Sequence, residues 1–139
     1  MAEVKQRSLS GAIEYAAKVF QKLVVLQDCL YTTGTIDMCR CFTCGDPVPR
    51  SIRLHAGHWK KRSNHSVLFE RVNCAAQCRS CNINCHGNMS IFRQKAIERW
   101  GEPAVNRIEI MAKQVKHWSF LEIDAMVKNW RVEIKKMEK

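Results

Sequence analysis

No uninterrupted apolar run in the 139 residues is long enough to span a bilayer, which takes about 20 residues. The first ten residues are polar and lack the hydrophobic stretch of a signal peptide. Internal repeats and low-complexity tracts are also absent. These absences argue against membrane proteins, secreted proteins and repeat arrays. We expect a soluble protein of a reducing cytoplasm, with one domain and no membrane partner.

Acidic residues are scarce relative to basic ones. The chain has 13 Asp and Glu against 23 Lys and Arg, a net charge of +10 that attracts polyanions. Residues 38–97 contain ten of the cations and only two anions, so most of the excess lies in the middle segment. A surface that is only solubilising does not require this concentration, and we expect binding to DNA. The candidate DNA-binding residues are Arg53, Lys60, Lys61, Arg62, Arg71, Arg79 and Arg93.

Cysteine is abundant, with eight residues. Disulfides do not persist in a reducing compartment, so thiols paired at short spacing are better explained as metal ligands. Two Cys-x-x-Cys pairs are separated by 33 residues, whereas a redox motif needs only one pair. Gly45 follows the first pair and allows a positive φ that turns backbone N–H groups toward a thiolate. The pattern predicts a structural Zn²⁺ held by Cys41, Cys44, Cys78 and Cys81.

The remaining cysteines leave alternatives open. Cys39 lies two residues from Cys41 and can replace it as a ligand. A less favoured alternative is a second zinc, held by Cys39, Cys74, Cys85 and His86. The other three thiols are expected to be small buried apolar residues: Cys29, Cys74 and Cys85.

Helical periodicity flanks the cysteine-rich middle. Apolar residues recur at helical spacing from Ser10 to Gln27, with Ser10 as the expected N-cap. A second helix is expected from Ser90 to Trp100, ended by Gly101, and Pro103 suits the first turn of a third.

The last helix has the strongest start signal. Ser119 and Glu122 match a capping box, and Trp118 with Ile123 matches a hydrophobic staple. We expect its apolar stripe to pack against the body of the domain, with a dimer seam as the alternative. The stripe consists of Ile123, Met126, Val127, Trp130 and Ile134.

Candidate catalytic residues lie between and just after the cysteine pairs. The run His55-Ala-Gly-His58-Trp stands directly before Lys60-Lys-Arg62, and a histidine beside cations suits water activation near a phosphate. Asn73 lies five residues before Cys78 and Asn82 follows Cys81. His86 lies one helical turn beyond Asn82, and an i, i+4 pair can bind one metal.

These motifs resemble the NinG (Rap) recombination proteins of lambdoid phages, within the ββα-metal or His-Asn-His nucleases. The resemblance covers about Leu23 to Glu109. Its matching pieces are Cys-Phe-Thr-Cys-Gly (41–45), Ala-Gly-His-Trp (56–59), Asn73, Gln-Cys-Arg-Ser-Cys-Asn (77–82), Gly-Asn (87–88) and Gly-Glu-Pro-Ala-Val-Asn-Arg-Ile-Glu (101–109). The Cys-x-x-Cys-Asn block is also similar to phage endonuclease VII, a Holliday-junction resolvase in which this asparagine binds the catalytic metal.

The resemblance implies a metal-dependent DNA endonuclease, encoded by a phage or prophage and acting in the bacterial cytoplasm on branched recombination intermediates. His58 would be the general base, and Asn82 with His86 would hold Mg²⁺ or Mn²⁺. Asn73 would anchor the loop that orients His58. Arg71 and the run Lys60 to Arg62 would clamp phosphates. No small-molecule cofactor is expected.

One position departs from the nuclease pattern. Many members of the class have an Asp or His ligand directly before the general base, where this chain has Gly57. His55 is the nearest substitute, but residues 55 and 58 of a regular strand point to opposite faces. A bulge at Gly57 would bring them together, and Asp37 is a more distant candidate.

Together these features predict an α+β fold, mostly helical, in which a small zinc-stapled ββα-metal (His-Me finger) core is flanked by α-helices. The expected segments are an N-terminal helix in 1–36, the nuclease core in 37–100 and a helical region in 101–139. Because two symmetric cuts resolve a four-way junction, we expect a homodimer. The rival hypothesis is a non-catalytic zinc-knuckle module that binds nucleic acid, which explains the charge and cysteines but leaves the His and Asn residues without a role.

Overall fold

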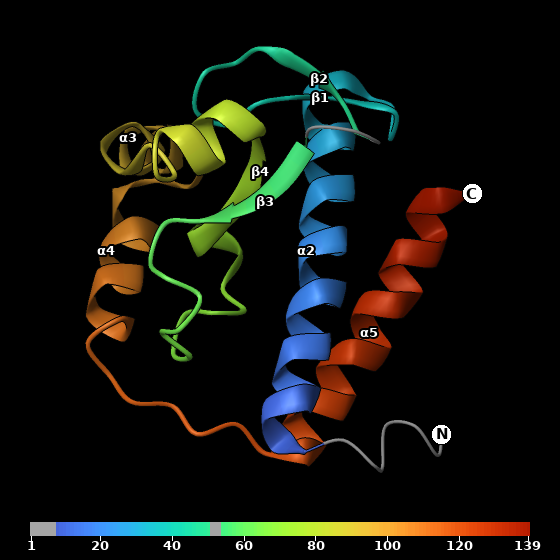
Figure 1. Ribbon diagram of the computed structural model, residues 1–139, viewed down its shortest axis with the longest axis vertical. Coiled ribbons are helices and arrows are strands. Elements are labelled where there is room, and N and C mark those ends of the chain that lie inside the picture. Colours follow the sequence, from blue (N-terminus) through green and yellow to red (C-terminus); the bar gives the residue numbers. More distant parts are fainter. Residues whose placement is uncertain (1–7, 51–53) are drawn as a thin grey trace.

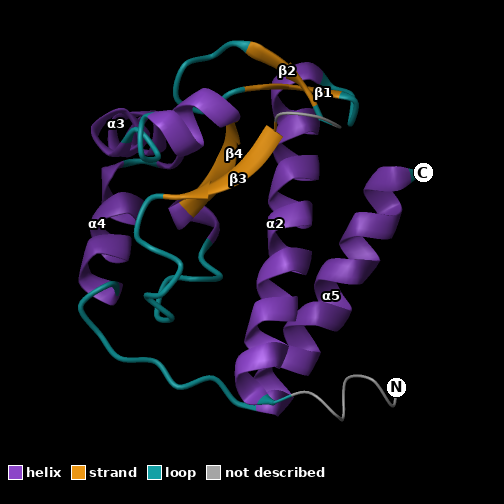
Figure 2. Cartoon of the chain, viewed as in Figure 1, coloured by secondary structure: helices purple, strands orange, loops and turns teal. Residues whose placement is uncertain are grey.

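The computed structural model describes residues 8–50 and 54–139 and has an α+β fold made mainly of helices, which confirms the predicted fold class (Figures 1 and 2). The elements, in chain order, are α2 Leu9–Thr33, β1 Met38–Arg40, β2 Pro47–Pro49, β3 Leu54–His58, the 3-10 turn η1 Arg71–Asn73, β4 Cys74–Cys78, the π-helical turn η2 Ser80–Asn84, α3 Met89–Trp100, α4 Glu102–Met111 and α5 Phe120–Glu138. None of the helices in these ranges is both long enough and apolar enough to cross a membrane.

Helix α2 is longer than its apolar periodicity predicted. Ser8, not Ser10, is the N-cap, because its side chain accepts a hydrogen bond from the Gly11 N–H at 3.0 Å. The helix continues to Thr33 and ends at Gly34, whose φ of +78° lets its N–H bond to the Leu30 carbonyl. The last two turns contain several polar residues, so apolar spacing did not predict this extension.

The boundaries of α3 and α4 are close to those predicted. Asn88, not Ser90, is the N-cap of α3 and has a left-handed backbone. Gly101 ends α3 as predicted, and Pro103 lies in the first turn of α4.

Helix α5 starts with the predicted capping box: the Ser119 hydroxyl accepts from the Glu122 N–H at 3.2 Å, and Glu122 accepts from the Ser119 N–H at 3.0 Å. The helix lies beside α2 and runs in the same direction (Figure 1). Its apolar stripe packs into one cluster with α2, where the Trp130 ring lies 5.1 Å from that of Phe20. The packing prediction is confirmed, and the alternative of a dimer seam would have to use a stripe that α2 already contacts.

Strands β3 and β4 pair antiparallel in a regular register, from Leu54 opposite Cys78 to His58 opposite Cys74. Strands β1 and β2 form a separate two-stranded sheet. The order of β3, β4 and then the helices η2 and α3 is the predicted ββα order. Cys74 packs in the cluster of α2, whereas its neighbour Ala75 packs with Phe92 of α3, so the strand pair lies between two helical layers.

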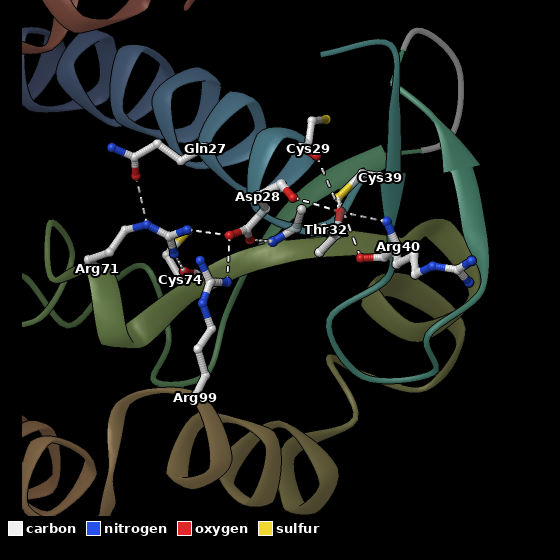
Figure 3. A network of polar contacts seen from close by, with 10 residues as sticks. Gln27, Asp28, Cys29, Thr32, Cys39, Arg40, Arg71, Cys74 and Arg99 are labelled. Atoms are coloured by element: carbon white, nitrogen blue, oxygen red, sulfur yellow. Dashed lines mark hydrogen bonds and ion pairs between the residues drawn. The ribbon is translucent and has the colours of Figure 1, made fainter. Parts of the chain in front are cut away.

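A buried carboxylate ties these layers together (Figure 3). Asp28 of α2 is only 2% exposed and accepts hydrogen bonds from the Arg71 guanidinium, from Arg99 Nη1 at 2.6 Å and from the Ala76 N–H at 2.8 Å. Arg71 also donates to the Cys74 carbonyl at 2.6 Å. Three elements that are distant in sequence, namely η1, β4 and α3, are thereby fixed to α2.

We predict that Asp28→Asn lowers the free energy of unfolding by about 3 kcal/mol or more, because two partly buried guanidinium groups lose their counter-charge. Urea denaturation followed by circular dichroism measures the change, with zinc present throughout. Glu138→Gln is the matched control, since it removes an exposed ion pair with Lys22 and should cost less than about 1 kcal/mol. Equal losses in both variants would show that Asp28 does not anchor the fold.

Candidate functional site

Four cysteine sulfurs from two turns lie together at one end of the strand pair. Cys41 and Cys44 lie in the turn between β1 and β2, whereas Cys78 ends β4 and Cys81 lies in η2. All four Sγ atoms are within 4.8 Å of one another, and those of Cys44 and Cys78 are 3.8 Å apart. Tetrahedral zinc with Zn–S bonds of about 2.3 Å requires sulfurs about 3.8 Å apart. The predicted cysteines are therefore placed together, and this donor set fits zinc.

Backbone groups favour a thiolate in this cluster. Burial raises the pKa of Cys41, but hydrogen bonds from the Cys44 backbone and the Thr43 side chain help to lower it to about 6. Gly45 has the predicted positive φ, +80°, and its N–H bonds to the Cys41 carbonyl at 2.9 Å. Burial and the nearby Cys41 sulfur raise the pKa of Cys78. Ionisation of the whole set therefore requires a bound cation.

Cys39 is not part of the cluster. Its thiol is buried beside Cys29 and Ala76, where burial raises its pKa to about 12. The Thr32 hydroxyl contacts its sulfur at 3.6 Å (Figure 3). The alternative in which Cys39 replaces Cys41 as a ligand is therefore wrong, because strand β1 points the Cys39 side chain toward α2.

Two of the three other cysteines are buried as predicted. Cys29 and Cys74 are fully buried, but Cys85 is exposed, because it follows η2 in a surface turn. Among the described residues the four-cysteine cluster is the only group of potential metal-binding Cys, His and acidic side chains, so the alternative of a second zinc at these thiols and His86 is not supported.

A cavity of about 410 Å³ is lined by residues of α2, β3, η2, the start of α3 and the loops that follow β3 and η2. It brings together four of the predicted catalytic residues with two of the predicted DNA-binding cations. No carboxylate is among the described residues that line it. The lining residues are Gln21, His55, Ala56, His58, Lys61, Arg62, Asn82, His86, Gly87 and Met89.

His58 is a neutral imidazole in this site. Burial, together with the charge of Arg62, lowers its pKa to about 4 despite a hydrogen bond to the Leu68 backbone. Because a carbonyl oxygen only accepts, Nε2 carries the proton and donates to the Leu68 carbonyl at 3.1 Å. Nδ1 therefore carries the lone pair and accepts a hydrogen bond from the Cys74 thiol at 4.0 Å. At neutral pH this is the ring nitrogen without a proton.

Asn73 is fully buried and does not line the cavity. Its Oδ1 accepts from the Lys60 N–H at 2.6 Å, and its Nδ2 donates to the carbonyls of Lys60 and Val67, both at 3.1 Å. Leu68, whose carbonyl accepts the hydrogen bond from His58, directly follows Val67. The Asn73 amide thus holds both ends of the loop against which the His58 ring is oriented.

Asn82 and His86 line the same cavity but do not form the predicted i, i+4 pair of a regular helix. Asn82 lies in the π-helical turn η2, which ends at Asn84, and His86 has a left-handed φ of +51°. The predicted i, i+4 pair on a regular helix is therefore wrong, although the turn still brings both side chains to one cavity. Single π-helical turns are frequent at functional sites.

Strand β3 has no bulge at Gly57. The register with β4 is regular, so the predicted bulge is wrong, and His55 and His58 do lie on opposite faces. Both still line the cavity. Asp37 does not line it and accepts instead from the Thr35 hydroxyl at 3.5 Å.

The predicted phosphate clamps divide into two groups. Lys61 and Arg62 line the cavity, and Lys60 places its Nζ 4.5 Å from the centre of the Trp59 ring. The prediction for Arg71 is corrected, because its guanidinium is held by Asp28.

The remaining predicted cations lie away from the cavity. Arg93 forms an ion pair with Glu109 at 3.0 Å, which reduces its availability for phosphate. Arg79 lines a different hollow, beside Asp46. Arg53 lies outside the described residues.

Two glutamines received no role from the sequence. Gln21 lines the cavity from α2, and Gln77 is fully buried in β4. The only signal for Gln77 was its polarity within an otherwise apolar strand sequence, Cys-Ala-Ala-Gln-Cys.

Comparison with known proteins identifies one relationship. The sequence pattern of a family described as Bacteriophage Lambda NinG protein matches residues 3–139. The resemblance inferred from the motifs is thus confirmed over a longer stretch than Leu23 to Glu109. No curated protein and no solved structure matches the chain.

We predict one tightly bound zinc per chain and loss of that zinc in Cys78→Ser, with unfolding around the strand ends because metal binding supplies folding free energy there. Elemental analysis of the dialysed protein measures the metal, and circular dichroism measures the fold. Cys85→Ser is the matched control, since its exposed thiol lies outside the cluster and should leave the zinc content unchanged. A zinc-free wild-type protein with an unaltered spectrum would contradict the structural role.

Proposed function

Because the chain belongs to the NinG family, we propose that it is a metal-dependent DNA endonuclease that cuts branched recombination intermediates in the cytoplasm of the bacterial host. One observation carries the proposal. A single cavity holds a neutral histidine, two further imidazoles, an asparagine and two exposed cations. These groups suit hydrolysis of a phosphodiester, which needs a proton acceptor, a site for a divalent ion and a clamp for the phosphate.

His58 is the proposed general base. Its ring is neutral near pH 7, and the Leu68 carbonyl fixes the tautomer, so Nδ1 can take a proton from a water molecule that attacks the phosphorus. The bond to the leaving oxygen breaks as the new P–O bond forms. Asn73 is a positioning residue, because it holds the loop that contains Leu68.

Asn82 and His86 are the proposed ligands of a divalent ion, Mg²⁺ or Mn²⁺. When bound, this ion would stabilise the negative charge that grows on the phosphate oxygens. Lys61 and Arg62 lie on the cavity wall and would stabilise the same negative charge on the phosphate oxygens.

Arg62 also suggests a path for the DNA beyond the cavity. It lines a second hollow of about 500 Å³ together with Lys116 and the start of α2. The two hollows share this one residue, so a nucleic-acid backbone that leaves the cavity past Arg62 would enter the second hollow, which also contains Glu14 and a Lys116 paired with Glu122 at 2.7 Å. The net charge of +10 favours such a polyanion.

We predict that the purified protein cuts a labelled four-way junction faster than a matched linear duplex when Mg²⁺ or Mn²⁺ is present. His58→Ala should lose at least about a hundredfold in rate, because general bases contribute that much or more, while its affinity for the junction stays unchanged. Gel electrophoresis measures cleavage, and mobility shift measures binding. Wild-type protein in buffer without divalent ions is the control and should bind without cutting.

The rival reading predicts a different result. Tight junction binding with no cleavage by wild-type protein under any metal would identify a zinc-knuckle binding module. The absence of a carboxylate among the described residues that line the cavity favours this rival, so the assay decides between the two.

We further infer a homodimer on the junction, since two symmetric strands must be cut. The α5 stripe is covered by α2, so the dimer must use another surface. Size-exclusion chromatography with light scattering should give twice the chain mass of 16.1 kDa for the protein bound to the junction, after subtraction of the DNA. A mass of one chain with and without DNA would remove the inference.

A further inference from the structure

Gln77 contains a buried oxygen atom without a partner. The residue is fully buried in β4. Among the described residues, its Oε1 is the only buried side-chain nitrogen or oxygen atom that makes no hydrogen bond. An unsatisfied buried carbonyl is costly, and its presence calls for an explanation by water, an ion or strain.

The direction of this oxygen is fixed by the other half of the amide. Gln77 Nε2 donates to the Gly87 carbonyl at 2.9 Å and to the Thr43 hydroxyl at 3.2 Å. Because the Gly87 carbonyl can only accept, rotation of the amide by half a turn would place two oxygens against each other. The oxygen is therefore held on the side of Gly57.

Gly57 leaves the space that the oxygen fills. A Cβ atom at residue 57 would lie 1.8 Å from Gln77 Oε1 and 3.0 Å from Asn82 Oδ1. Any side chain at this position would displace the Gln77 amide. Two carbonyl oxygens, one from β4 and one from η2, thus lie around the same point, and Asn82 and Gly87 both line the adjacent cavity.

We propose that Gln77 Oε1 is a ligand of the divalent ion in this site and shares the ion with Asn82 Oδ1. The inference rests on the proposed function, because it names a further ligand for the same ion. A cation supplies the partner that the buried oxygen lacks. Asn82 Oδ1 lies around the same point as the buried oxygen and would be the second acceptor for that cation.

The ligand set selects the kind of ion. Two amide oxygens and the imidazole of His86, which lines the same cavity, carry no negative charge, and no carboxylate is among the described lining residues. Mg²⁺ favours carboxylates and retains its waters, whereas Mn²⁺ accepts oxygen and imidazole ligands together. The site therefore prefers Mn²⁺ to Mg²⁺.

The test is Mn²⁺ binding to the zinc-loaded full chain, measured by electron paramagnetic resonance of free Mn²⁺. Wild-type protein should bind one Mn²⁺, which Mg²⁺ displaces only in large excess. Gln77→Met keeps the buried volume but removes the oxygen, and should weaken Mn²⁺ binding at least about tenfold with the zinc content unchanged. Unchanged Mn²⁺ affinity in Gln77→Met, or no Mn²⁺ binding by wild-type protein, overturns the inference.

Asn82→Asp tests the site independently if Gln77→Met does not fold. If the two oxygens share a cation, the added charge should tighten Mn²⁺ binding about tenfold. If instead the Asn82 amide turns and donates to Gln77 Oε1, the aspartate removes that donor, so Mn²⁺ binding stays the same or weakens and the inference fails. Junction cleavage is measured separately. If Gln77→Met cleaves the junction and binds Mn²⁺ with unaltered affinity, Gln77 is not a ligand but the protein is a nuclease. If wild-type protein binds Mn²⁺, Gln77→Met weakens that binding and neither cleaves the junction, Gln77 is a ligand but the protein is not a nuclease.

Discussion

The buried carboxylate of Asp28 is the interaction on which the arrangement of the other elements depends. A charge at this depth is tolerated only because two guanidinium groups and a backbone N–H surround it. Its partners come from η1, β4 and α3, so one side chain of α2 fixes three segments. Strand β4 then sets the position of β3 through the register, and of Cys78 and Gln77 through its own sequence.

The cysteine cluster performs a second and separate task. The β1–β2 hairpin is small and packs on α2 and α3: Cys39 lies beside Cys29, and the Phe42 ring lies 4.7 Å from that of Phe92 and 5.5 Å from that of Trp100. A metal at the four thiols would join this hairpin to the end of β4 and to η2. Because η2 also contains Asn82, the same metal would hold one wall of the cavity. The structural centre and the candidate catalytic site are therefore mechanically linked.

Features that depend on a few neighbouring residues could be predicted from the sequence. The capping box at Ser119, the stop at Gly101 and the two cysteine pairs are all local patterns, and the structure has each of them. The histidine and asparagine candidates came from their spacing around the cysteine pairs, and the resemblance added their roles; His58 and Asn82 do line one cavity.

Features that depend on a distant partner could not be predicted. Arg71 looked like a phosphate clamp because its counter-charge, Asp28, is 43 residues away in sequence. One signal for that pair was present: Asp28 lies four residues after Val24, on the buried face of an apolar helix, where an acid requires a basic partner. The π-helical turn at Asn82 had no such signal, since helical spacing does not reveal its local winding.

The proposed chemistry also accounts for the unusual charge of the cavity. A site with neutral ligands and exposed cations would hold a divalent ion less tightly without DNA than with it, because no carboxylate among the described lining residues offsets the ion's charge. A bound phosphodiester supplies the missing negative charge, since its oxygens can ligate the ion while Lys61 and Arg62 hold the same phosphate. Binding of the ion and binding of the DNA would then strengthen each other by an equal factor, as linkage requires. On this reasoning Gly57 and Gln77 would act as a pair. Gly57 stands where many nucleases of the class have an Asp or His ligand, the Gln77 oxygen would replace that ligand, and the phosphate of the substrate would supply the remaining ligands.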